Sequence, residues 1–474
     1  MKKTPRLQRT QRAVRRESSL VFLCVLCTLC LLCAESAANG CAESAANGCA
    51  ERAANGCAER AANGCAESAA NGCAERAANG CGGRAANGCA ERAASGQEPT
   101  APQTVTAAQL QAAIGKLGDL DYAARTTASR TVRRTASAQA VPALLQAVAE
   151  QPDGYVRFRA LVLLTGFNDP RTKDSMRESL VSPNDRLRTV AYSFFEHNPD
   201  RAMAPQFLTA LDKEQAEFVR PALVRAMAAL AAGSAAAGDD AARVRQALLR
   251  EVARGEDFFR SAVIEALGDY KAQYAVDALA AVAKLEGPLQ DDAALALGKI
   301  GDKRALETLA AIQRTAPRQT QPSIATAICL LGVNCESHEG YLVDVLKFAD
   351  KNRGFQELLR GAAGGLAALA LAGHPEAARA LVEIGVPSSD PTRAPVALAL
   401  ATVALRNTAL MMTMLEKLGD REPALALLAE GFDMLEEDLD KERFFAFARR
   451  TYWESPDSSP RRALMQTLIG KLDF

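Results

Sequence analysis

The sequence has few aromatic residues and no net charge. Aromatics make up 5% of its 474 residues, Trp453 is the single tryptophan, and 56 basic residues balance 56 acidic ones. A neutral chain lacks the basic footprint of nucleic-acid binding, so we exclude nucleic acid as a partner. Alanine-rich sequence with few aromatics favours close-packed helices over sheets. The composition therefore predicts an all-α protein.

Recognisable catalytic and metal-binding motifs are also missing. The sequence contains no nucleophile elbow, no phosphate-binding glycine loop and no HExxH motif. The three histidines, His197, His338 and His374, lie far apart, each beside residues that are typical of turns. We therefore predict no catalytic residue, no metal site and no cofactor.

The amino terminus reads as an export signal. Seven basic residues within residues 1–16 precede an apolar run from Leu20 to Cys33. This run of 14 residues fits the apolar core of a signal peptide and is shorter than the roughly 20 residues that span a membrane. Ala34 and Ser36 provide small side chains for cleavage after residue 36. We assign residues 1–36 to a signal peptide, with an uncleaved signal anchor as the alternative.

Lipid attachment is a second alternative for this terminus. Cys33 closes the apolar run but follows Leu31 and Leu32, where a lipidation motif has a small residue. Cys41 follows Gly40, which is small, but it lies beyond the apolar core. Cys33 and Cys41 are therefore the two candidates for lipidation. Contact with a membrane is expected only through this terminal segment or through a lipid.

An octapeptide array follows. From Cys33 to Gly96 the unit Cys-Ala-Glu-Ser/Arg-Ala-Ala-Asn-Gly occurs eight times. Asn-Gly in each unit interrupts any helix, and the residue types are poor strand formers. We predict that residues 33–104 form a disordered tether and linker. Cysteines separated by seven residues do not have the spacing of a zinc site. If the segment is exported, they could instead form disulfides that cross-link chains.

The body of the chain repeats itself. Arg157, Arg188, Arg220 and Arg260 close four similar tetrapeptides, separated by 31, 32 and 40 residues. An Ala/Gly insertion at residues 231–240 accounts for the longest interval. Each arginine precedes an apolar stretch at helical spacing, and a period of this length indicates stacked supersecondary units.

Turn residues divide residues 105–474 into helix pairs. Thr106 and Gln109 form a capping box that opens a first capping helix, and residues 460–472 are expected to form a last one. We place Gly268 and Gly298 at helix ends, where a left-handed cap is wanted. The expected pairs cover residues 122–150, 155–180, 186–211, a fourth pair containing the insertion, 261–285, 291–313, 321–347, 358–384, 395–418 and 425–450.

Residues of the fifth and sixth pairs resemble HEAT repeats, in particular the bacterial type that is also found in phycobilin lyases. The resemblance is carried by Asp257-x-x-Arg260, Ala266-Leu267-Gly268 and Ala275-Val276-x-x-Leu279, and again by Leu297-Gly298 and Ala305-Leu306-x-x-Leu309. It covers residues 120–315 well and weakens beyond them. It implies an α-solenoid whose concave surface is lined by the second helices and which binds or scaffolds proteins more often than it catalyses.

The arginine ladder of Arg157, Arg188, Arg220 and Arg260 has two interpretations. Planar guanidinium groups can hydrogen-bond carboxylates or carbonyls at the inter-repeat turns, or they can form a basic stripe for an anionic partner. In the carboxyl-terminal half, Cys329 and Cys335 are candidates for a disulfide. The aromatic residues Phe444, Phe445, Tyr452 and Trp453 are candidates for core packing or for an exposed patch that binds a partner.

These features predict a non-enzymatic protein-binding or scaffolding module of the bacterial cell envelope, periplasmic or tethered to a membrane. The partner is expected to be a protein that the sequence does not identify. Two alternatives remain open: a chromophore-lyase-like enzyme, and a cytoplasmic adaptor whose start site is mis-assigned.

Overall fold

The computed structural model describes residues 104–232, 238–352, 354–435 and 438–474. These belong to a compact unit of residues 92–474. The signal segment, the octapeptide array and the lipidation candidates Cys33 and Cys41 lie outside the described residues.

The described residues form 22 α-helices, and no β-strand occurs among them. The fold class is therefore all-α, as predicted. The helices and their bounds are α5 (Ala107–Gly115), α6 (Tyr122–Arg134), α7 (Ser137–Glu150), α8 (Gly154–Thr165), α9 (Arg171–Ser179), α10 (Asp185–His197), α11 (Ala204–Lys213), α12 (Arg220–Ala231), α13 (Asp239–Val252), α14 (Asp257–Asp269), α15 (Val276–Ala283), α16 (Gln290–Ile300), α17 (Ala305–Gln313), α18 (Gln321–Leu330), α19 (Cys335–Lys351), α20 (Gln356–Leu371), α21 (Pro375–Gly385), α22 (Arg393–Arg406), α23 (Thr408–Lys417), α24 (Glu422–Asp433), α25 (Leu439–Glu454) and α26 (Pro460–Leu472).

Helix pairs lie where the repeat pattern places them. Thr106 and Gln109 form the predicted capping box at the start of α5. The pairs run from α6 and α7 to α24 and α25, and α26 follows as the last helix. In the pair that carries the insertion, α12 ends at Ala231 and α13 begins at Asp239.

The two helices of a pair differ in how much of their surface is buried. In α12, nine of the twelve residues are buried, on all sides of the helix. In α13, burial is confined to one stripe that includes Val244, Ala247, Leu248 and Glu251, the spacing of an amphipathic helix. The first helix of this pair therefore packs on several neighbours, and the second covers it from one side.

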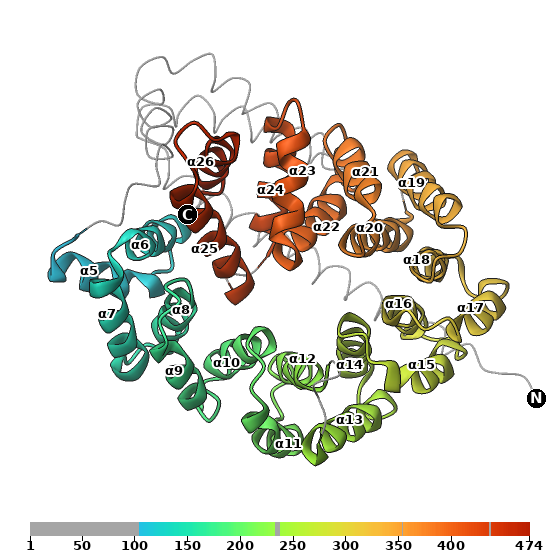
Figure 1. Cartoon of the computed structure of the whole chain (residues 1–474), viewed down its shortest axis with the longest axis horizontal. Helices are drawn as coiled ribbons and strands as arrows, with labels where there is room; N and C mark the ends of the chain where they lie inside the picture. Colours follow the sequence, from blue (N-terminus) through green and yellow to red (C-terminus); the bar gives the residue numbers. More distant parts are fainter. Residues whose placement is uncertain (1–103, 233–237, 353, 436–437) are drawn as a thin grey trace, which may run out of the picture. The chain divides into compact units, whose positions relative to one another are not determined.

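The first helices line the inside of the solenoid (Figure 1). The helices α8, α10, α12, α14, α16, α18, α20 and α22 each pack against the next in this series. The expectation that the second helices line the concave surface is therefore wrong. The helices of the inner layer must approach one another closely. The first helix of each pair permits this because it is rich in small and apolar residues.

Gly268 and Gly298 show how close this approach is. Both lie inside helices, α14 and α16, rather than at left-handed caps as predicted. A Cβ added at Gly268 would lie 2.7 Å from the Cα atom of Ala296 on the next inner helix. The left-handed cap after α16 is instead Gly301, with φ of 81°. These two glycines serve helix packing and not chain reversal.

The helical array closes on itself. Helix α25 packs against α8 and also contacts α10 (Figure 1). Arg133 of α6 and Glu442 of α25 form a buried ion pair of 2.8 Å, and their side chains are 7% and 3% exposed. Arg130 pairs with Asp473, and Arg134 donates to the carbonyl oxygen of Phe474 at 3.2 Å. The first repeats and the last helices thus share one interface.

Candidate functional site

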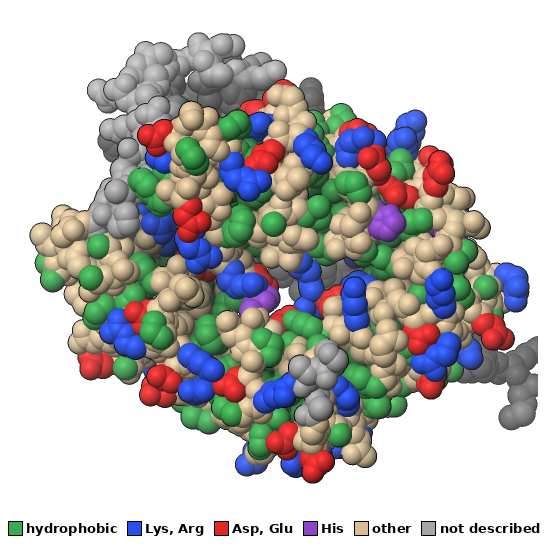
Figure 2. Space-filling model, in the orientation of Figure 1, with side chains coloured by type: hydrophobic (Ala, Val, Ile, Leu, Met, Phe, Trp, Pro, Cys, Tyr) green, Lys and Arg blue, Asp and Glu red, His purple; other side chains and the backbone are tan. Residues whose placement is uncertain are grey.

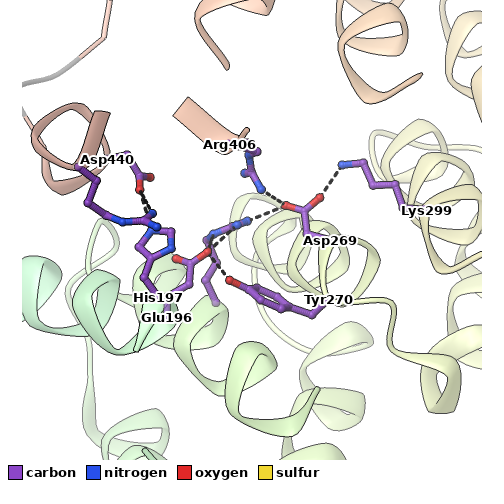
Figure 3. A network of polar contacts seen from close by, with 9 residues as sticks. Glu196, His197, Asp269, Tyr270, Lys299, Arg406 and Asp440 are labelled. Carbon is purple, nitrogen blue, oxygen red and sulfur yellow. Dashed lines mark hydrogen bonds and ion pairs between the residues drawn. The ribbon is translucent and has the colours of Figure 1, made fainter. Parts of the chain in front are cut away.

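Charged side chains meet on the inner face of the array. Asp269, the last residue of α14, accepts hydrogen bonds from Arg225 of α12 at 3.0 Å, from Lys299 of α16 at 2.8 Å and from Arg406 of α22 at 2.5 Å. Figure 3 shows that Arg406 reaches Asp269 from a helix other than those that carry Asp269 and Lys299. Burial would raise the pKa of Asp269, but Lys299, Arg406 and Arg225 together hold it well below its usual range.

A second acid completes this inner network. Glu196 of α10 forms an ion pair of 2.7 Å with Arg225 and accepts a hydrogen bond of 2.8 Å from the hydroxyl of Tyr270. Burial and the charge of Glu196 raise the pKa of Tyr270 above its ordinary value, so the phenol stays protonated and donates. The inner network is defined here as Glu196, Arg225, Asp269, Tyr270, Lys299 and Arg406.

His197 lies beside this network and joins α10 to α25. Its Nε2 atom lies 2.6 Å from a carboxylate oxygen of Asp440. Figure 2 shows a narrow opening between the helices, bordered by basic, acidic and histidine side chains. Because these charges satisfy one another across the opening, the inner face is occupied by intramolecular pairs. The network links helices that lie far apart in sequence.

The arginine ladder holds the inter-repeat loops. Arg157 and Arg260 donate from Nε to the carbonyl oxygens of Val148 and Val252, at 2.7 and 3.0 Å. These carbonyls belong to the last turns of α7 and α13. Each arginine thus caps the end of the helix before its own, where carbonyls lack helical partners.

The two other ladder residues differ in their contacts. Arg188 binds Glu214 through two hydrogen bonds of 2.8 and 2.9 Å and also donates to the carbonyl oxygen of Ser182. The guanidinium of Arg220 lies over the ring of Phe259, 3.5 Å from its centroid. All four ladder residues are half-buried at inter-repeat turns, so they do not form a continuous free basic stripe.

Later repeats use the same device with other residue types, which the sequence pattern did not reveal. Gln290 donates to the carbonyl oxygen of Ala283, Gln321 to that of Gln313, and Arg393 to that of Gly385, each at 3.0 Å. Each donor lies in the first turn of an inner helix and reaches the end of the preceding outer helix. A polar residue at the start of each first helix would have been the signal, since arginine itself is not required.

Apolar side chains are exposed at four successive inter-repeat positions. Val181, Phe218, Phe258 and Leu285 are 76%, 79%, 52% and 64% exposed. Val181, Phe218 and Leu285 lie in the connections before α10, α12 and α16, and Phe258 lies in the first turn of α14, so each of four successive junctions between helix pairs carries one of them. We call this row the inter-repeat rim. Exposed apolar groups arranged in a row mark interaction surfaces more often than isolated ones do.

The carboxyl-terminal aromatic residues do not form one surface. Phe444 and Phe445 are 1% and 7% exposed, and their rings pack with Phe432. These two residues therefore belong to the core and not to an exposed patch. Tyr452 and Trp453 lie against the guanidinium of Arg462, with ring centroids at 4.4 and 5.7 Å.

Cys329 and Cys335 are joined by a disulfide. Cys329 lies near the end of α18 and is buried, and Cys335 begins α19. The Sγ atom of Cys335 lies 3.6 Å from Nδ1 of His374, the residue before α21. This contact could not be predicted from the sequence, because His374 follows Cys335 by 39 residues and lies in another repeat.

Within the described residues, no single helix is long and apolar enough to cross a membrane. The pair α22 and α23, bent by 117°, passes the test of length and composition only when its two helices are taken together.

Comparison with known proteins finds HEAT repeats in one part of the chain. Residues 110–196 match the family model described as HEAT repeats. Among solved structures, the chain is similar to the crystal structure of an engineered protein, with 15% identity over 77% of this chain and 99% of the other, and a TM-score of 0.31. No curated protein matches the chain.

Proposed function

We propose that this HEAT-repeat protein is a non-enzymatic binding or scaffolding module of the bacterial cell envelope, and that a partner protein binds along its inter-repeat rim. Support for the envelope comes from the amino-terminal sequence, where basic residues precede the apolar run from Leu20 to Cys33. Support for protein binding comes from the repeat family and from the rim.

The observation that carries the proposal is the exposure of Val181, Phe218, Phe258 and Leu285 at or beside four successive junctions between helix pairs. The inner face is a weaker candidate because its charges are already paired across the opening. A partner would have to break these buried contacts before it could bind there, whereas the rim is free of such a cost.

The rim also indicates the shape of its partner. Adjacent helices pack about 8–10 Å apart, so four rim residues make a row of roughly 30 Å. A polyproline II segment rises about 3.1 Å per residue and has three residues per turn. Such a segment brings every third side chain to one face at a step of about 9 Å. We therefore propose that the partner presents an extended segment with an apolar residue at every third position.

Site-specific photo-cross-linking in the native host tests this proposal. A photoreactive phenylalanine analogue replaces Phe218 or Phe258, and Lys303, exposed in the turn between α16 and α17, serves as the control position. We expect a discrete adduct with one protein from the two rim positions and not from the control. Equal adducts from all three positions would contradict the assignment of the rim.

The cross-linked protein then allows a binding measurement. We expect the double variant Phe218→Ser with Phe258→Ser to bind it at least about tenfold more weakly, because buried aromatic anchors dominate interface energies. Lys303→Ser should bind as the parent does. Unchanged affinity of the double variant would refute the rim as the binding surface.

The envelope assignment needs a separate test. Amino-terminal sequencing and intact mass of the native protein, taken from soluble and membrane fractions, should show cleavage after Ser36 or a lipid-modified cysteine. An intact Met1 in the cytoplasm would contradict export.

A further inference from the structure

We propose that Cys329, Cys335 and His374 form a zinc site when the two cysteines are reduced, so that disulfide and metal are alternative states of the same cluster. This inference is independent of the partner-binding function. It rests on the convergence of three ligand-type side chains from three separate elements.

The cluster has the geometry of a metal site. One donor atom from each of the three residues lies within 4.8 Å of the other two, and no other group of three such residues was found among the described residues. The distance from Cys335 Sγ to His374 Nδ1 is 3.6 Å. Zinc bonds of about 2.3 Å to sulfur and 2.0–2.1 Å to nitrogen, at a tetrahedral angle, separate these two atoms by about 3.6 Å.

The donor set selects the metal. Two thiolates and one imidazole are soft to borderline ligands, which favour Zn²⁺ over Mg²⁺ or Ca²⁺. Cys329 is 1% exposed, and Cys335 and His374 are half-buried. The site is thus shielded on one side and open on the other, so a water molecule can fill the fourth position.

Glu339 lies one turn after Cys335 on α19. Burial raises the pKa of its carboxyl group, and the charge of His374 opposes this rise. Glu339 thus places an acidic side chain on the helix that supplies Cys335.

The disulfide state and the zinc-bound state interconvert through a redox step and a metal-binding step. A dithiol reductant transfers two electrons and two protons to the Cys329–Cys335 disulfide, and the reductant becomes a disulfide itself. Binding of Zn²⁺ then displaces the two thiol protons, while the neutral imidazole coordinates through Nδ1. A disulfide oxidant reverses the sequence and releases the metal.

The position of the cluster gives the exchange a structural consequence. Cys329 belongs to the carboxyl-terminal core and Leu331, two residues later, to the amino-terminal core. The disulfide links α18 only to α19. Zinc would add α21, and with it the next repeat, so the metal-bound state ties together three elements near the boundary of the two cores.

Cysteine alkylation mapped by mass spectrometry tests the proposal on the full chain. The protein is reduced, freed of reductant under anaerobic conditions, and alkylated with and without Zn²⁺. We expect zinc to slow the alkylation of Cys335 at least about tenfold in the parent, with protection lost in His374→Ala. The alkylation rate of Cys335 without zinc serves as the reference for each variant.

His338→Ala is the matched control, because His338 lies three residues after Cys335 on α19 and is not one of the three cluster residues. It should keep the protection that His374→Ala loses, and circular dichroism should show that both variants are folded. Equal protection in the parent and in His374→Ala, or no protection by zinc in the parent, would overturn the proposal. Should His374→Ala fail to fold, His374→Gln serves the same comparison.

A cobalt titration gives a second readout. Reduced parent protein should bind one more equivalent of Co²⁺ than Cys335→Ser, with a thiolate-to-cobalt charge-transfer band for that equivalent. Identical stoichiometry in the two proteins would assign all metal binding to the array and refute the site.

Discussion

The ion pair between Arg133 and Glu442 provides the sharpest test of how the solenoid closes. Both side chains are almost fully buried, 2.8 Å apart, and they come from α6 and α25, which are 309 residues apart at this contact. The Arg133 guanidinium also lies over the ring of Phe445, 4.9 Å from its centroid. We consider the substitution Glu442→Gln, which keeps the shape and removes the charge.

The expected cost is large because positive charge would remain buried. Removing one partner of a buried ion pair typically costs about 3–5 kcal/mol. Arg449 of α25 donates to the carbonyl oxygen of Arg133. Burial lowers the pKa of Arg449 to about 10, Glu442 opposes this shift, and Arg133 adds to it. Without Glu442, two arginines would face each other with no acid between them. We expect a loss near the upper part of this range.

Unfolding in urea, followed by far-UV circular dichroism, measures this loss. The double variant Arg133→Met with Glu442→Leu replaces the pair by apolar side chains, and it should recover much of the stability. The control is Arg360→Gln, which breaks an exposed pair with Glu357 of 3.0 Å and should cost less than about 1 kcal/mol. A cost below about 1 kcal/mol for Glu442→Gln, or a double variant as unstable as the sum of its single substitutions, would refute the reasoning.

Three further predictions concern the inner helices and the inner network. Gly268→Ala should destabilise the protein by about 1–3 kcal/mol, because the new methyl group would collide with Ala296. The control is Gly364→Ala, whose methyl group would meet nothing within 4 Å and which should be neutral or stabilise by up to about 1 kcal/mol. Thermal unfolding of the two variants measures the difference. Asp269→Asn should destabilise at neutral pH, because Arg225, Lys299 and Arg406 lose their shared acid, and denaturant titration would show it. Since the folded-state pKa of Asp269 is depressed, its contribution is present above the unfolded pKa of about 3.9 and is lost as pH falls below it. The stability difference between parent and Asp269→Asn should therefore be constant from about pH 5 to 8 and shrink below about pH 4.

The helix pairs could be predicted from the sequence because their signals are local. Apolar residues at helical spacing, the capping box at Thr106 and the Asn, Asp and Pro residues in the turns are enough to place most helix ends. Gly268 and Gly298 were misplaced for a physical reason. A glycine near a helix end can serve a left-handed cap or a close helix contact, and only the neighbouring helix decides which.

The contacts that close the array could not be predicted, because they depend on how rotation accumulates along the repeats. Arg406 and Asp269 are 137 residues apart in sequence, and neither residue lies in a motif. The pairing of His374 with Cys335 likewise depends on how two repeats stack. The first helix of each pair lines the inner face because it is buried on several sides. A repeat motif alone does not specify this burial.

Energy transfer from Trp453 to an acceptor at Ala138 tests the closure most directly. Trp453 is the only tryptophan of the chain, and it lies one turn after Arg449, which contacts Arg133 across the interface. A fluorescent amino acid at the exposed Ala138 needs no cysteine chemistry. We predict efficient transfer in the native protein, lost in urea. An open stack of ten helix pairs at about 10 Å each would place the two positions on the order of 100 Å apart, and the resulting absence of transfer would contradict the closed solenoid.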